Sequence, residues 1–184
     1  MEKVDDRTIL EKFTEDFVKV LERHAKYIIV SGFVAILHGR SRGTEDIDII
    51  TEKLQPEKFA LLHEDLIKSG FECLQSRSSE EIYTYLKDNT SVRYVKKGTY
   101  LPQMELKFAR DQIDNYQITT RKKLPLTGTD FFFPSIESAI AFKEELLKSN
   151  KDLKDAQHLR VIYGKKLDEL EIERVKTEIK KLRL

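Results

Sequence analysis

The segment Ile29–Ile50, "IVSGFVAILHGRSRGTEDIDII", decides how the rest of the chain is interpreted. An apolar run enters a corner at Ser31 and Gly32, and after a stretch rich in glycine and arginine the chain leaves as Asp-Ile-Asp-Ile-Ile. Alternate residues of a strand share a face, so Asp46 and Asp48 project together while the isoleucines face a core. Two neighbouring carboxylates repel each other unless cations lie between them, and Mg²⁺ suits such oxygen ligands. The segment therefore predicts a metal-binding strand.

A third carboxylate stands in another apolar strand, "QMELKFA", where Glu105 lies between Met104 and Leu106. If this strand lies beside the aspartate strand, the three carboxylates can hold two ions, one on the phosphates of a nucleotide and one on an attacking hydroxyl. The alternative is an ordinary surface ion pair between Glu105 and Lys107, which lies two residues further along the same face. Both interpretations stay open on the sequence alone.

The corner before the aspartates has the features of a phosphate site. Backbone N–H groups at Ser31 and Gly32 would approach a phosphate closely at the start of a helix, where the helix dipole favours anions. Arg40 and Arg42 lie on the following loop and could reach the same phosphates. The alternatives are an ordinary strand-to-helix turn, loop arginines without a ligand, and a Thr44 that only orders the loop.

Composition limits the class of protein. The chain has 184 residues, and Lys+Arg 33 against Asp+Glu 32 gives a net charge of +1, which argues against nucleic-acid binding by bulk charge alone. The single cysteine, Cys73, excludes an internal disulfide and a cysteine-based zinc cluster. The start "MEKVDDRTIL" has no signal-peptide character, and no window approaches the ~20 apolar residues of a membrane span. We therefore expect a cytoplasmic protein without a membrane partner, and the high Lys and Glu content fits a thermophile.

Strands and helices are mixed through residue 134, and the last 50 residues read as helices, which predicts an α+β fold. The expected fold is a mixed β-sheet core with helices on one side and a C-terminal helical region. We place the core with its N-terminal helix at 1–134 and the helical region at 135–184, packed together as one compact unit. The predicted helices cover 6–25, 33–39, 56–68, 78–88, 111–116, 135–148, 151–164 and 167–182. The predicted strands cover 27–32, 45–51, 71–75, 91–98 and 100–109, with a small hairpin within 119–135.

At this point the sequence resembles the polymerase-β nucleotidyltransferase superfamily, and more narrowly its minimal prokaryotic members related to abortive-infection toxins. The front motif of that family is a Gly-Gly corner, a helix and Gly-x-x-Arg-x-Thr-x-Asp-h-Asp, where h is apolar. The matching residues are Ser31, Gly32, Gly39, Arg42, Thr44, Asp46 and Asp48. A rear motif matches in order within "PSIESAIAFKEELLKSNKDLKDAQHL" at Lys143, Lys151, Asp152 and Asp155. The chain departs from the pattern at Ser31, which replaces the first glycine, and at Glu105, where Asp is commoner.

The resemblance implies a Mg²⁺-dependent enzyme that moves a nucleoside monophosphate from a nucleoside triphosphate to a hydroxyl acceptor. The metal ligands and catalytic residues would be Asp46, Asp48 and Glu105, with one or two Mg²⁺ ions. The nucleotide-binding residues would be Ser31, Gly32, Arg42, Thr44, Lys143, Lys151, Asp152 and Asp155. The acceptor would be an RNA 3′ end, a protein or a small molecule, and the protein would act as a toxin with a cognate antitoxin.

Each of these roles has a structural alternative. Lys143 could be an exposed helix residue paired with a neighbouring glutamate, and Asp152 and Asp155 could simply share a helix face and offset the helix dipole. The alternative for the whole protein is a module on the same fold that binds nucleotides or regulates a partner without turnover. A set of basic residues beside Glu105 keeps an RNA acceptor open: Arg93, Lys96, Lys97, Lys107 and Arg110.

Overall fold

The computed structural model describes residues 6–184. The chain forms two compact units. Of the described residues, the first unit holds 6–27 together with Thr44–Arg110, and the second holds Ile28–Gly43 together with Asp111–Leu184. Each unit thus combines segments that are distant in sequence, a division that no single change in composition marks. The division after residue 134 that the sequence suggests is a different one and stays a prediction.

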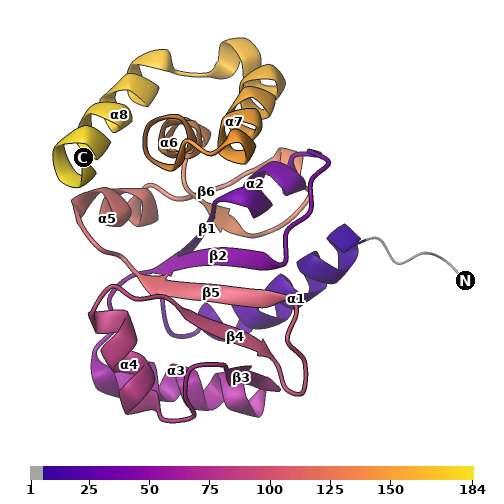
Figure 1. The fold of residues 1–184 in the computed structure, drawn as a ribbon, viewed down its shortest axis with the longest axis vertical. Helices are drawn as coiled ribbons and strands as arrows, with labels where there is room; N and C mark the ends of the chain where they lie inside the picture. The colour runs from indigo at the N-terminus through magenta and orange to yellow at the C-terminus, as the bar shows by residue number, and fades with distance from the viewer. Residues whose placement is uncertain (1–5) are drawn as a thin grey trace, which may run out of the picture. The chain divides into compact units, whose positions relative to one another are not determined.

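The first unit is built on a sheet. Its helices and strands are α1 (Asp6–Leu21), β2 (Asp46–Thr51), α3 (Pro56–Lys68), β3 (Phe71–Cys73), α4 (Ser79–Lys87), β4 (Val92–Lys96) and β5 (Gln103–Phe108). The chain passes between the units within β1 (Tyr27–Val30), and the five-stranded sheet has the order β1-β2-β5-β4-β3. Figure 1 shows β2, β5 and β4 side by side in that order. Strands β2 and β5 are parallel, whereas β4 is antiparallel to both β5 and β3, so the sheet is mixed.

One face of this sheet is apolar and carries helices. Ile47 and Ile49 of β2 are fully buried, and so are Met104 and Leu106 of β5, as the alternation of the sequence requires. Aromatic pairs join the helices to the strands: Phe17 of α1 lies 5.7 Å from the ring of Tyr94, and Phe59 of α3 lies 6.2 Å from that of Phe108. The polar residues of β2 and β5 are therefore left on the opposite face.

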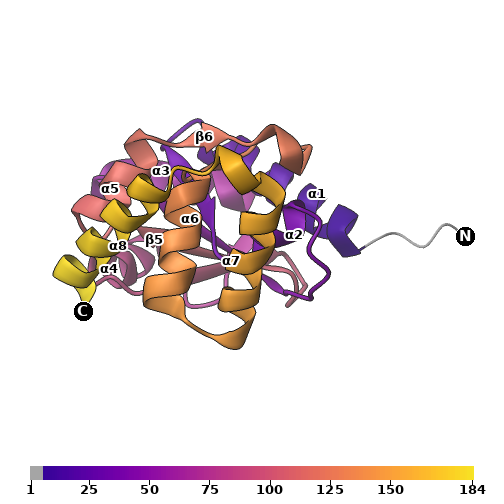
Figure 2. The ribbon, with the colours of Figure 1, turned by 90° about the horizontal axis from the view of Figure 1, so that it is seen from above.

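The second unit is mainly helical. Its helices and strands are α2 (Gly32–Leu37), α5 (Gln112–Thr119), β6 (Lys122–Lys123), β7 (Phe132–Phe133), α6 (Ile136–Phe142), α7 (Asn150–Tyr163) and α8 (Glu169–Arg183). Short helical turns at Pro125–Thr127 and Gly164–Lys166 complete it. Helices α6, α7 and α8 lie side by side (Figure 2) and bury Ile140, Leu159, Ile172, Val175 and Ile179.

The α+β class, the mixed sheet and the C-terminal helices confirm the fold expected from the sequence. One helix differs in detail. The pattern predicts a single helix from 135 to 148, but α6 ends at Phe142 and continues as a π-helical turn, Lys143–Leu147. Lys148 then ends the turn with a left-handed φ of 55°. Among residues 6–184, no helix combines the length and the apolar character needed to cross a bilayer.

Candidate active site

The structure places the predicted acidic residues on two neighbouring strands, β2 and β5, as the sequence led us to expect. In the parallel register of β2 with β5, Asp48 is opposite Glu105 and Asp46 is opposite Gln103. All of these residues alternate with buried apolar ones and are partly exposed, so their side chains share the polar face of the sheet. The expectation that the strand of Glu105 lies beside the aspartates is therefore confirmed.

The carboxylate of Glu105 has partners of its own on β4. Ser91 Oγ donates a hydrogen bond of 2.7 Å to Glu105 Oε1, and an Arg93 nitrogen lies 3.4 Å from Oε2. Arg93 is directly opposite Glu105 in the antiparallel register, so the ion pair runs across the sheet rather than along β5 to Lys107. Within residues 6–184, no group of three or more His, Cys, Asp or Glu side chains is arranged to hold a metal ion.

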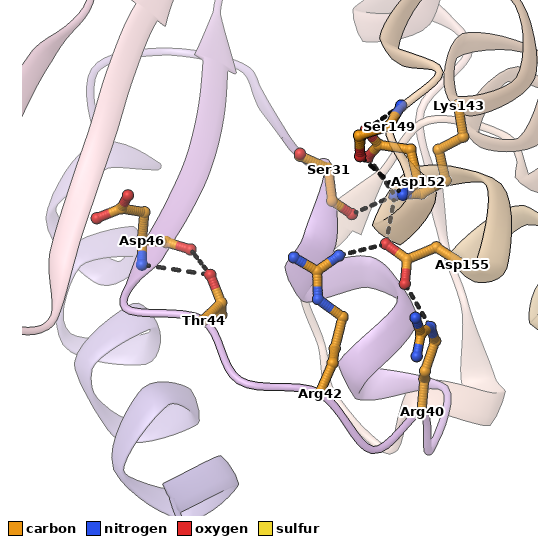
Figure 3. Close-up of polar contacts among 9 residues, drawn as sticks. All are labelled: Ser31, Arg40, Arg42, Thr44, Asp46, Lys143, Ser149, Asp152 and Asp155. Atoms are coloured by element: carbon orange, nitrogen blue, oxygen red, sulfur yellow. Dashed lines mark hydrogen bonds and ion pairs between the residues drawn. The ribbon is translucent and has the colours of Figure 1, made fainter.

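The loop before β2 is ordered by Thr44. Its hydroxyl donates to the Asp46 carbonyl at 2.9 Å and accepts from the Asp46 N–H at 3.4 Å, as Figure 3 shows. The neighbouring Glu45 carbonyl accepts from the Gln103 N–H at 2.8 Å, which continues the pairing of the strands. These contacts agree with the alternative in which Thr44 orders the backbone that carries Asp46.

The predicted phosphate corner belongs to the second unit. Ser31 has φ 68° and ψ −142°, a conformation that glycine adopts easily and other residues rarely do. This explains why the related motif has glycine at that position. A Cβ atom on Gly32 would lie 3.0 Å from the guanidinium carbon of Arg42, so the absence of a side chain lets Arg42 lie directly against the corner.

A buried ion cluster lies beside this corner, with Asp155 at its centre (Figure 3). Asp155 is fully buried. Its Oδ1 lies 2.6 Å from Arg40 Nε, and its Oδ2 lies 2.5 Å from an Arg42 nitrogen and 3.1 Å from Lys143 Nζ. Three cations therefore converge on one carboxylate that water does not reach. Removing one partner from such a buried ion cluster is costly, because an uncompensated charge then remains in the interior.

Lys143 connects the cluster to the corner. It is only 1% exposed, which excludes the surface role considered as its alternative. Its ammonium group donates to the Ser31 carbonyl at 3.2 Å as well as to Asp155, and Asp152 Oδ1 lies 4.0 Å away. The unusual backbone of Ser31 is thus held by a buried lysine, which is itself neutralised by Asp155.

The other residues of the rear motif lie at the start of α7. Asp152 forms a capping box with Ser149: its N–H donates to Ser149 Oγ at 3.1 Å, and its carboxylate accepts from the Ser149 N–H at 3.3 Å and from the Ser149 hydroxyl. Lys151 is exposed on the first turn. Asp152 therefore stabilises the helix start and completes the cluster around Lys143.

The candidate residues thus form two groups, one in each unit. The first unit brings together Thr44, Asp46, Asp48 and Glu105, and the second brings together Ser31, Gly32, Arg42, Lys143, Asp152 and Asp155. Ser91 was not anticipated, whereas Arg40 and Arg93 were expected near phosphates or RNA and pair instead with Asp155 and Glu105. Arg40 and Arg93 carry no motif signal beyond their charge, because their partners are set by tertiary pairing.

Comparison with solved structures identifies the fold. The antibiotic-resistance factor ANT(2'')-Ia matches in its solution structure with a TM-score of 0.58 and 12% identity over 95% of this chain and 93% of that one. Its crystal structure with adenylyl-2''-tobramycin matches with a TM-score of 0.57 and 14% identity over 95% and 98%. An antigenic nucleotidyltransferase-like protein from Paracoccidioides brasiliensis matches with a TM-score of 0.52 and 18% identity over 94% and 88%. No family model matches the chain, and no curated protein matches its sequence. The chain therefore shares the fold of these proteins.

Proposed function

We propose that this protein, on its polymerase-β-like nucleotidyltransferase fold, transfers a nucleoside monophosphate from a nucleoside triphosphate to a hydroxyl acceptor. The observation that carries the proposal is the polar face of β2 and β5. There Asp46 and Asp48 alternate with buried isoleucines, and Glu105 stands opposite Asp48 in the register. A structural role does not explain acidic residues here, because they are poor strand formers and repel each other.

The chain's own residues divide the work of the reaction. Asp46 and Asp48 supply oxygen ligands that fit Mg²⁺, and bound Mg²⁺ would neutralise phosphate charge and lower the pKa of the acceptor hydroxyl. Glu105 would supply a third ligand once it leaves Arg93. That exchange costs little, because the pair is long at 3.4 Å and its side chains are 24% and 40% exposed.

The second group binds and positions the nucleotide. Backbone N–H groups at Ser31 and Gly32 contact the phosphates, and Arg42 adds positive charge beside them. Lys143 and Asp155 are buried, so we assign them to positioning: they hold the Ser31 carbonyl and the guanidinium of Arg42. The exposed Lys151 is left to reach the phosphates from the first turn of α7.

A second candidate function has its own supporting observation. Glu105 is engaged by Ser91 and Arg93, and residues 6–184 contain no ready group of three metal-binding side chains. A module that binds a nucleotide without turnover would look the same. Binding of labelled nucleotide without transfer to any acceptor would favour this function over the enzyme.

Transfer of label tests the enzyme directly. The protein is incubated with Mg²⁺, each α-labelled nucleoside triphosphate, and total RNA, protein lysate or aminoglycosides, the last because ANT(2'')-Ia was solved with adenylyl-2''-tobramycin. Asp46→Asn and Asp48→Asn should reduce transfer by more than the roughly 10–100-fold that loss of an outer-shell partner costs. Glu45→Gln is the matched control, because this exposed carboxylate precedes Asp46 directly. Transfer that survives in either aspartate variant would contradict the assignment.

The resemblance to abortive-infection toxins adds a cellular role to the proposal. A toxin of this kind would arrest the growth of cells that express it, and a cognate antitoxin would relieve the arrest. Controlled expression of the wild type and of Asp46→Asn tests this. Arrest by the wild type alone would support a toxin that acts through transfer. Unimpaired growth of both cultures would refute the toxin role and leave the enzymatic proposal intact.

A further inference from the structure

Ser91 and Arg93 hold the two oxygens of the Glu105 carboxylate in different ways. Ser91 Oγ donates a short hydrogen bond of 2.7 Å to Oε1, whereas an Arg93 nitrogen lies 3.4 Å from Oε2. The side chains of Arg93 and Glu105 are 40% and 24% exposed, so water weakens their ion pair. One oxygen is therefore anchored, and the other is held by a contact that exchanges easily.

Arg93 lies in one row with two of the candidate metal ligands. Asp48 is opposite Glu105 in the register of β2 with β5, and Glu105 is opposite Arg93 in the register of β5 with β4. Figure 1 shows these three strands side by side. Residues directly opposite each other in a sheet project from the same face, and neighbouring strands are about 4.8 Å apart. The guanidinium group of Arg93 thus lies on the face on which a divalent cation would bind.

The backbone of Arg93 is fixed, so an exchange of partner requires only its side chain to move. Its N–H donates to Gln75 Oε1 at 2.8 Å, and its carbonyl accepts from the Leu74 N–H at 2.8 Å. The residues on either side, Val92 and Tyr94, are fully buried. Because an arginine side chain has several rotatable bonds, it can change partner while the strand stays in place.

A divalent cation and the Arg93 guanidinium would compete for Glu105. The guanidinium occupies Oε2, and two positive charges at such close range repel each other. Once the cation is bound, Arg93 has lost its carboxylate and faces added positive charge. A phosphate group restores the balance, because a guanidinium binds phosphate through two parallel hydrogen bonds. The exchange of partners therefore couples metal binding to phosphate binding.

We propose that Arg93 exchanges Glu105 for a phosphate group of the nucleoside triphosphate when the metal site fills, while Ser91 keeps Glu105 in position. Arg93 is then the counter-ion of Glu105 in the resting protein and a phosphate ligand in the loaded protein. The inference rests on the proposed function, because it assigns roles at the metal and triphosphate site of that function. It predicts opposite effects on metal affinity for two neighbours of a single carboxylate.

Metal binding is measured first, without nucleotide, by the electron paramagnetic resonance of free Mn²⁺ titrated with the full chain. Mn²⁺ prefers the same oxygen ligands as Mg²⁺. Arg93→Gln removes the competitor and should tighten Mn²⁺ binding about twofold to fivefold, the range of an exposed ion pair. Ser91→Ala removes the anchor and should weaken Mn²⁺ binding about tenfold, as the loss of an outer-shell partner does.

The matched control is Lys107→Gln. It removes the same charge from the same face of β5, two residues from Glu105. A general change of the electrostatic field would affect both glutamine variants alike, whereas exchange at Glu105 requires the larger effect from Arg93→Gln. The difference should vanish when Glu105→Gln is added to both variants, because no carboxylate is then left to compete for.

Phosphate binding is measured next, by calorimetry with inorganic triphosphate at saturating Mn²⁺, a probe that carries no base. Arg93→Gln should weaken triphosphate binding about tenfold or more, because a charge-assisted hydrogen bond is lost. Arg93→Lys keeps the charge and should lose less. An Arg93→Gln variant that binds Mn²⁺ no more tightly than Lys107→Gln does, or that binds triphosphate like the wild type, would overturn the proposal.

Nucleotide transfer is measured last, so that the two proposals fail separately. If transfer occurs and depends on Asp46 but Arg93→Gln fails either binding test, the exchange is wrong and the transferase function stands. If both binding tests succeed and no acceptor is ever labelled, the exchange stands and the protein is a nucleotide-binding module. If Asp46→Asn binds Mn²⁺ as tightly as the wild type, the metal binds elsewhere and both proposals are wrong.

Discussion

Replacing Asp155 by asparagine removes the buried carboxylate at the centre of the cluster while keeping its shape. Arg40 and Arg42 lose their partner, but their side chains are 16% exposed and can turn towards water. Lys143 cannot do so, because its side chain is 2% exposed and its next carboxylate is 4.0 Å away. The loss is therefore dominated by one uncompensated buried ammonium group, which costs about 3–5 kcal/mol.

Urea denaturation followed by circular dichroism measures this loss as a difference in the free energy of unfolding. In a thermal scan it corresponds to a drop of roughly 6–20 °C for a chain of this length. The matched control is Asp130→Asn, which breaks an ion pair of 2.6 Å with Lys123 in which Asp130 is 88% exposed. Such an exposed pair contributes about 1 kcal/mol or less.

A second variant separates charge from packing. Adding Lys143→Met to Asp155→Asn removes the stranded ammonium group, so the double variant should recover at least about 1 kcal/mol relative to the sum of the single losses. If Asp155→Asn costs no more than the Asp130 control, the cluster is not the electrostatic unit described above. Additive single losses would refute the direct coupling between Lys143 and Asp155.

Two further outcomes follow from the second unit. Burial alone would raise the pKa of Asp111, but hydrogen bonds from Arg183 and from backbone N–H groups lower it. The stabilisation that the charged Asp111 provides is therefore complete above its unfolded pKa and is lost as pH falls through its lower folded pKa. Arg183→Ala should cost about 2 kcal/mol of unfolding free energy near neutrality. In pH-dependent urea melts, this difference from the wild type should vanish under strong acid. At Ser31, glycine should be tolerated with a change in unfolding free energy of about 1 kcal/mol or less, whereas valine should cost about 1–3 kcal/mol, since φ is 68°.

Local signals account for the elements that the sequence predicts well. Helix α3 spans Pro56–Lys68 as expected, because proline is favoured in a first turn and Gly70, with φ 87°, follows the end. Strand β2 follows from strict alternation around Asp46 and Asp48, and β5 from the apolar neighbours of Glu105. These patterns depend on a few consecutive residues, so they can be interpreted without knowledge of the fold.

Long-range pairing accounts for what the sequence leaves open. The sequence indicates only that Asp155 lies on one face of a helix. Nothing in its spacing indicates that it pairs with Arg42, which is 113 positions away. The partner of Glu105 could be predicted only with the register of β4, which places Arg93 rather than Lys107 beside the carboxylate. The π-helical turn at Lys143 likewise has no local signal, since the apolar pattern continues through it.

The division of the second unit between two distant segments has a consequence for its synthesis. Every residue of α2 is buried in the finished protein, and His38, directly after it, is hydrogen-bonded to Tyr163 at the end of α7. At about 5–20 residues per second, a ribosome needs several seconds or more to deliver α7 after α2 has emerged. The nascent chain therefore carries an uncovered apolar helix through most of its translation. That interval is when chaperones would encounter it and when aggregation would compete with folding.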